Sequence, residues 1–93
     1  MDEPLDRSVA KRLLRKILEH GKVAFSNHAL REMAKDDLDT VDCTNVLRGG
    51  VVGSTELERN SWRYRVSTQR ICVVVAFRSE TELVVVTAWR TAK

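Results

Sequence analysis

The sequence contains little proline, glycine or cysteine. Its 93 residues include one Pro, four Gly and two Cys, whereas 43% are hydrophobic and 31% are charged. This composition excludes collagen-like, low-complexity and disulfide-rich classes, and it is typical of one globular domain, expected to span residues 1–93. Because Cys43 and Cys72 lack CxxC spacing and the two histidines are scattered, we expect free thiols, no metal site and no cofactor.

Long hydrophobic runs are also absent. The segment ICVVVAF is far too short to cross a bilayer, and the acidic start MDEPLDRSVA has no apolar stretch behind basic residues. We therefore expect a cytoplasmic protein without a membrane partner.

Positive charge is concentrated in the C-terminal part of the chain. Residues 1–58 contain 9 Lys or Arg and 11 Asp or Glu, whereas residues 59–93 contain 7 and 2, so the overall charge of +3 comes from the second segment. The planar guanidinium of arginine suits phosphate oxygens, which makes RNA the expected partner. Six of those seven basic residues are arginines: Arg59, Arg63, Arg65, Arg70, Arg78 and Arg90.

Helical periodicity and capping residues predict three helices in the first half of the chain. Pro4 suits a first helical turn, and an apolar stripe continues to the stop at Gly21. After the short extended link KVAF, Ser26 is a good N-cap for a helix in which Leu30 and Met33 face the core. Asp39 or Thr40 starts the last helix, which Gly49 ends. The expected helices span residues 4–20, 27–35 and 40–48.

An alternating pattern follows Gly50 and predicts a sheet over residues 51–90. The connections between the predicted strands are short, which forces antiparallel pairing because a parallel crossover needs about a dozen residues or more. We therefore predict an α+β fold in which three N-terminal helices pack on a four-stranded antiparallel meander, with an open sheet face that carries arginines. The predicted strands span residues 51–58, 62–68, 71–78 and 83–90.

Several segments together resemble a known family. They are FSNHALREM, VLRGGVV, WRYRV, ICVVVAF and LVVVTAWR, and they resemble the domain of unknown function 4258 family over about residues 22–90. The most distinctive element is F-S-x-H-A, which contains His28. The order Arg31-Glu32 departs from the Glu-Arg order usual in that family. The family is similar in layout to RelE-like ribonuclease toxins, which place helices before a small antiparallel sheet and cut RNA on its open face.

His28 is the strongest candidate for chemistry. RNA cleavage without a metal ion needs one group to accept the 2′-hydroxyl proton, another to protonate the departing 5′-oxygen, and cations to stabilise the phosphorane. Near the start of its predicted helix, His28 lies among unpaired backbone N–H groups that attract phosphate. We expect it to be an acid–base catalyst. The alternative is a structural histidine that fixes the helix to the sheet through a hydrogen bond.

Arginines on the predicted sheet are the candidate RNA ligands. Arg65 and Arg90 each follow an aromatic residue on an alternating strand, so we expect them to hold the phosphate during catalysis. The alternative for each arginine is a solvent-exposed side chain that prevents pairing at the sheet edge. Further nucleic-acid contacts are expected from Arg63, Arg31, Arg78 and Trp89.

The resemblance and these residues together imply a RelE-like endoribonuclease that needs no metal. It would be the toxin of a bacterial toxin–antitoxin pair, and its partners would be RNA and an antitoxin protein. A second hypothesis is a non-catalytic module of the same fold that binds a protein or nucleic acid through its arginine face. A third is a regulatory protein that forms a homodimer through its first helix.

Overall fold

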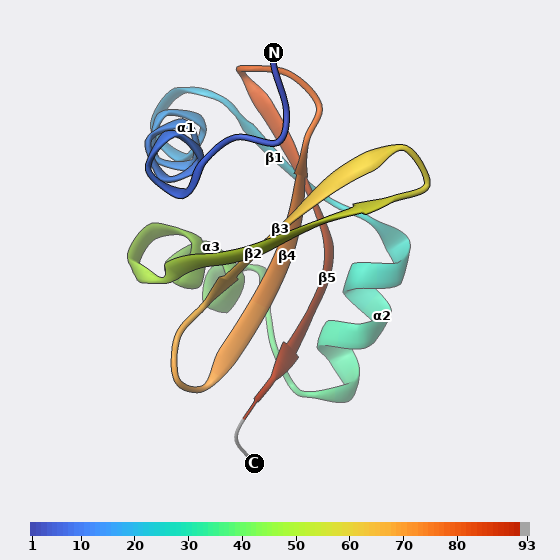
Figure 1. The fold of residues 1–93 in the computed structure, drawn as a ribbon. Helices are drawn as coiled ribbons and strands as arrows, with labels where there is room; N and C mark the ends of the chain where they lie inside the picture. The colour runs from blue at the N-terminus through green and yellow to red at the C-terminus, as the bar shows by residue number, and fades with distance from the viewer. Residues whose placement is uncertain (92–93) are drawn as a thin grey trace.

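The computed structural model describes residues 1–91. In this part of the chain, three helices surround a five-stranded sheet with the strand order β1-β5-β4-β3-β2. The helices α1 and α3 lie on one side of the sheet, and α2 lies alongside β5 on the other side (Figure 1). The elements are α1 (Arg7–His20), β1 (Lys22–Phe25), α2 (Asn27–Lys35), α3 (Thr40–Gly49), β2 (Val51–Glu58), β3 (Ser61–Ser67), β4 (Ile71–Phe77) and β5 (Glu82–Arg90).

The α+β class is confirmed, but the prediction of four antiparallel strands is wrong. The segment KVAF, expected to be a link, forms the edge strand β1 and pairs in parallel with β5, from Lys22 opposite Glu82 to Phe25 opposite Val85. The other neighbouring strands are antiparallel, as predicted. A four-residue strand whose partner lies near the far end of the chain leaves no local pattern, so the sequence did not indicate it.

The helix boundaries follow their caps. The first helix begins at Arg7 rather than residue 4, because the Asp6 carboxylate accepts a hydrogen bond from the Val9 N–H at 2.9 Å and so forms the N-cap. The bounds predicted for α2 are confirmed, and α3 is one residue longer than predicted. A capping box in which Asp39 and Asp42 accept from each other's backbone N–H fixes its start.

The strand bounds also agree closely with the prediction. The first predicted strand, 51–58, is confirmed as β2, and the ends of the other three differ by one residue. The difference at β3 arises because only Arg59 and Asn60 form the turn, both with positive φ, at 51° and 62°. Such a two-residue turn matches the twist of the flanking strands.

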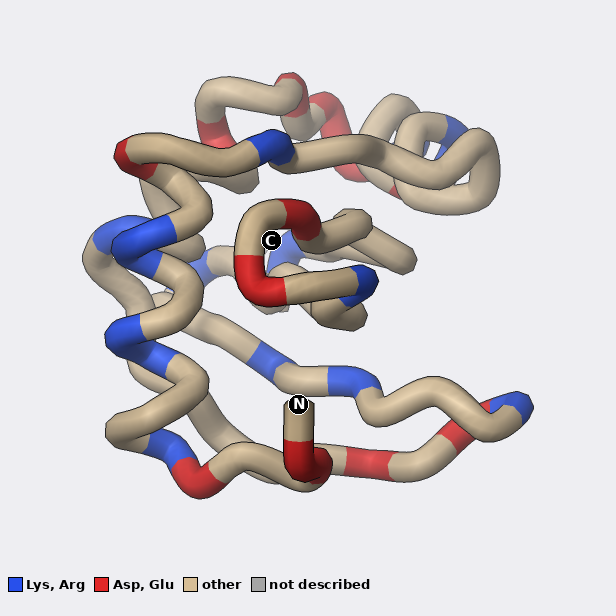
Figure 2. Tube along the Cα trace, turned by 90° about the horizontal axis from the view of Figure 1, so that it is seen from above, with Lys and Arg blue, Asp and Glu red and all other residues tan. Residues whose placement is uncertain are grey.

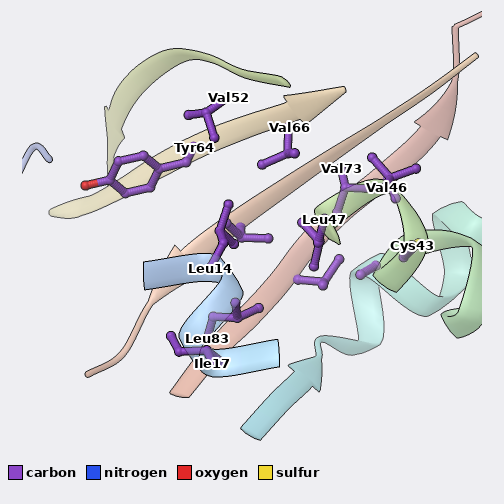
Figure 3. Close-up of a cluster of buried hydrophobic side chains, with 14 of the residues drawn as sticks. Leu14, Ile17, Cys43, Val46, Leu47, Val52, Tyr64, Val66, Val73 and Leu83 are labelled. Atoms are coloured by element: carbon purple, nitrogen blue, oxygen red, sulfur yellow. The ribbon is translucent and has the colours of Figure 1, made fainter. Parts of the chain in front are cut away.

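The main core lies between the sheet and the helices α1 and α3. Tyr64 and Val66 of β3 are fully buried, as their alternation with arginines predicted, and Tyr64 meets Phe77 edge to face with 5.0 Å between ring centroids. Figure 3 shows Leu14 and Leu47 pointing from the two helices toward these strands. Because one face of β3 is committed to this core, its arginines must lie on the opposite face.

Lys11 ties α1 to the end of α3. Its Nζ donates to the carbonyl oxygens of Leu47, Arg48 and Gly50, at 3.4, 3.1 and 2.7 Å. A cation at a helix C-terminus satisfies carbonyl groups that have no partner within the helix. Burial, with a smaller effect from Arg15, lowers the pKa of Lys11. None of the helices in residues 1–91 has the length and apolar character that a membrane crossing requires.

Candidate nucleic-acid interface

Two adjoining hollows lie on the sheet face opposite the main core, between α2 and the hairpin of β2 and β3. Glu58, Arg63 and Thr87 line both of them. The histidine hollow, of about 560 Å³, is completed by Ser26, His28, Arg59 and Val86. The tryptophan hollow, of about 120 Å³, is completed by Glu56, Arg65, Val74 and Trp89. Since the hollows share three lining residues, they adjoin, and we refer to them together as the groove.

Ser26 places the start of α2 at the groove. Its Oγ accepts from the Ala29 N–H at 3.0 Å, which caps the helix, and donates to the Val86 carbonyl at 3.1 Å. Val86 is the extra residue of a β-bulge in β5, between Val85 and Thr87. Bulges are frequent beside functional sites because they redirect a strand. One serine therefore links the bulge of β5 to the helix that carries His28.

His28 is exposed and lines the histidine hollow. Its side chain forms no hydrogen bond or ion pair with any other residue in the range 1–91, so nothing in that range supports the structural hydrogen bond that was its alternative role. Glu32, one helical turn after His28, forms an ion pair with Lys35 at 2.7 Å, and this contact, more than His28, lowers the pKa of the Glu32 carboxyl group. The imidazole is therefore free to face a ligand.

The orientation of α2 differs in one respect from the prediction. Met33 faces the interior as expected, with 2% of its surface exposed, but Leu30 is 44% exposed and Ala29 is buried in its place. The hydrogen bonds of Ser26 to β5 set this rotation, because they bring the first turn of the helix against the strand.

Arg63 lies where the two hollows meet. Its side chain is only 20% exposed, and its Nη1 lies 3.9 Å from Glu58 Oε2. The Nε is buried and has no acceptor among the described residues. A buried donor left unpaired costs about 1–3 kcal/mol, more when the group is charged, so such a group calls for an explanation. The Nε itself is shielded from solvent, so only the exposed remainder of the Arg63 side chain can meet a ligand in the groove.

Arg65 and Trp89 form the far end of the groove. The guanidinium carbon of Arg65 lies 5.5 Å from the centre of the Trp89 ring, within cation–π distance. On its other side, Arg65 Nη2 lies 3.7 Å from Glu56 Oε1. Figure 2 shows the charged hairpin of β2 and β3 extending away from the side of the molecule where the basic residues of α1 gather.

Three other predicted ligands lie outside the groove. Arg90 is held by the loop after α2: its Nε donates to the Asp36 carbonyl at 2.8 Å and its Nη2 to the Asp37 carbonyl at 3.2 Å. Arg78 forms an ion pair with Glu82 at 3.4 Å, in the turn between β4 and β5. Arg31 is exposed on α2 but lines neither hollow. The structure thus brings His28 together with Arg63, Arg65 and Trp89, without Arg90, Arg78 or Arg31.

The sequence prediction missed the groove residues Glu56, Glu58 and Arg59. A signal for them was present, because a two-residue turn at Arg59 and Asn60 sets the hairpin register. In that register Glu56 lies opposite Arg63, and the ion pairs of Glu58 with Arg63 and of Glu56 with Arg65 run diagonally across the two strands. The predicted strands 51–58 and 62–68 left residues 59–61 between them, so the prediction did not include this pairing.

The groove does not contain a nucleophilic thiol or a metal-ligand cluster. Cys72 is buried on the strand next to Trp89, and burial raises the pKa of its thiol, an effect partly opposed by Arg65. Among residues 1–91, no three His, Cys, Asp or Glu side chains come close enough together to hold a metal ion. The groups positioned for chemistry are therefore an imidazole, carboxylates and guanidinium groups.

Comparison with protein families gives one match. The model described as Domain of unknown function (DUF4258) matches residues 25–90. The chain belongs to this family. No curated protein and no solved structure matches it. The DUF4258 match begins at Phe25, directly before the N-cap of α2, and ends at Arg90, the last residue of β5. Every residue that lines the groove lies inside the matched DUF4258 segment.

Proposed function

We propose that this DUF4258 domain is an endoribonuclease that cleaves RNA without a metal ion, in the groove between α2 and the β2–β3 hairpin. The observation that carries the proposal is the pairing, in one hollow, of an unbonded exposed histidine with an arginine whose buried Nε has no acceptor. Histidine exchanges protons near neutral pH, and a guanidinium stabilises phosphate charge. Cleavage of RNA needs both of these functions.

The reaction is an internal displacement at phosphorus. The 2′-oxygen forms a bond to phosphorus while the bond from phosphorus to the 5′-oxygen breaks. One proton leaves the 2′-hydroxyl and another joins the departing oxygen, which gives a 2′,3′-cyclic phosphate and a 5′-hydroxyl. In this proposal the Glu58 carboxylate accepts the first proton and protonated His28 donates the second. Both side chains line the histidine hollow.

Arg63 and Arg59 are assigned to the phosphate. Arg63 lines the histidine hollow together with Arg59, which is exposed at the hairpin tip. Cations placed where charge increases in the transition state are usually the largest contribution to such a reaction. Arg90 has no part in this proposal, because its guanidinium is bonded to the loop after α2.

We also propose that this activity belongs to a RelE-like toxin with RNA as target and an antitoxin as partner. The support is the family resemblance and the placement of charged groups beside an open sheet face. On this proposal, inducing the protein in a bacterial host arrests growth, and inducing the His28→Gln variant does not.

A binding module without catalysis is the second candidate. Glu56 and Glu58 lie within 4 Å of Arg65 and Arg63 and partly neutralise them. Such alternating charges also suit a protein partner, because complementary charges fix the register of an interface. On this reading His28 contributes to binding only.

The two candidates are separated by His28→Gln, with His20→Gln as the matched control. His20 is also exposed but lies at the end of α1, outside the groove. Loss of general acid–base catalysis reduces the cleavage rate by roughly 10²–10⁴. We expect that loss for His28→Gln alone, with both melting temperatures unchanged. If folded wild-type protein leaves a mixed RNA substrate intact, the nuclease proposal is wrong.

A further inference from the structure

The two halves of the groove differ in charge. The histidine hollow sets Arg59, Arg63 and His28 against one carboxylate, Glu58. The tryptophan hollow sets two arginines against two carboxylates: Arg63 and Arg65 against Glu56 and Glu58. An anion therefore suits the first half. Unpaired charges at a site favour ligands of opposite charge. In the second half the charges balance, so a neutral group that offers both hydrogen-bond donors and acceptors suits it.

The walls of the tryptophan hollow suit a flat aromatic ring. Arg65 lies over the half-buried Trp89 ring, and Val74, 7% exposed and opposite Arg65 on the neighbouring strand, adds an apolar side chain to the lining. Aromatic rings and guanidinium planes are the surfaces on which single-stranded nucleic acids stack their bases. The second half of the groove thus combines a stacking surface with balanced charge.

The carboxylate of Glu56 is available to accept hydrogen bonds in the tryptophan hollow. It is 59% exposed and lies 3.7 Å from Arg65, a separation that leaves its oxygens able to accept further hydrogen bonds. Guanine presents two adjacent donors, N1–H and the N2 amino group, to one carboxylate, whereas the other bases present one. The O6 and N7 atoms of guanine accept from arginine. Guanine is thus the base that can donate twice to one carboxylate and also accept from an arginine.

We propose that the tryptophan hollow is a guanine-binding subsite. Arg65 and Trp89 stack the base and Glu56 reads its edge, while the phosphate of the same nucleotide occupies the histidine hollow. The two hollows share Arg63, so one nucleotide spans both. The placement of the phosphate rests on the proposed function, but recognition of the base does not require cleavage.

The test is calorimetric binding of 3′-GMP and 3′-AMP to the intact chain. We expect 3′-GMP to bind roughly 5- to 100-fold more tightly than 3′-AMP, as a bidentate contact to a base implies. In Glu56→Gln this ratio falls to about one, because a side-chain amide offers a single acceptor. The matched control is Glu80→Gln, an exposed carboxylate in the β4–β5 turn that lines neither hollow of the groove. A thermal melt verifies that each variant is folded.

The outcomes separate this inference from the proposed function. Selective binding of 3′-GMP by a protein that leaves RNA intact supports the subsite and removes the nuclease proposal. Cleavage of RNA with equal binding of 3′-GMP and 3′-AMP does the reverse. A guanine preference that survives in Glu56→Gln overturns the role of Glu56. Trp89→Phe and Arg65→Gln are each expected to weaken the binding of both nucleotides. Unchanged affinity in both variants overturns the stacking assignment.

Discussion

Replacement of Arg90 by alanine tests whether this side chain holds the fold together or binds RNA. The substitution removes two hydrogen bonds donated by a charged group, at 2.8 and 3.2 Å, to the carbonyls of Asp36 and Asp37. Hydrogen bonds to charged groups contribute about 1.5–3 kcal/mol, and the second one is exposed, so we expect a total loss of about 2 kcal/mol. For a domain of this size that loss lowers the melting temperature by roughly 8–16 °C.

The assay is thermal unfolding followed by circular dichroism, together with RNA binding measured well below the melting temperature. Arg78→Ala is the matched control, because Arg78 forms one exposed ion pair, with Glu82, and lies outside the groove. Exposed ion pairs contribute about 0–1 kcal/mol, so the control is expected to melt within a few degrees of wild type. RNA affinity is expected to be unchanged in both variants.

One result refutes this reasoning. If Arg90→Ala melts like the Arg78→Ala control but binds RNA tenfold more weakly or worse, Arg90 binds RNA, and its contacts with the loop after α2 contribute nothing. The sequence prediction of a phosphate ligand would then be right at this position.

Two further predictions concern the start of α2 and the core. Ser26→Ala removes the N-cap and the hydrogen bond to Val86, and it is expected to lower the free energy of unfolding by about 1–2 kcal/mol in a denaturant titration. Ser26→Thr keeps a side-chain hydroxyl, so this variant is expected to retain most of that stability. Burial, aided by nearby aspartates, raises the pKa of Cys43 from 9.0 to about 11, so the folded state favours the neutral thiol. Its contribution to stability is complete below pH 9.0 and is lost as the pH rises through about 11. The unfolding free energy of wild type should therefore fall more over that interval than that of Cys43→Val, and parallel curves would contradict the assignment.

The elements that the sequence predicted well are those with local signals. Ser26 and Asp39 marked the starts of α2 and α3, because an N-cap side chain bonds within its own helix turn. The alternation in β3 predicted which residues face the core and which arginines face the groove, since side chains in a strand alternate between faces. The place of His28 in the first turn of α2 was predicted for the same reason, because that place depends on the cap beside it.

The features that escaped prediction depend on partners far along the chain. The strand β1 exists only because Val23 and Ala24 meet β5. Arg90 was predicted to be a phosphate ligand because it lies on an alternating strand. Its partners are instead the carbonyls of Asp36 and Asp37, and no sequence pattern predicts this contact. The neutralising contact of Glu56 with Arg65 depends on strand register. The two-residue turn indicates this register, but the sequence prediction did not include it.

The parallel pairing of β1 with β5 affects when the groove can form during synthesis. Residues 22–25 are synthesised well before their partners at residues 82–85. The N-cap of α2 likewise bonds to Val86. A nascent chain therefore cannot seat α2 against the sheet until β5 has been synthesised, so the groove forms only after this last strand has left the ribosome.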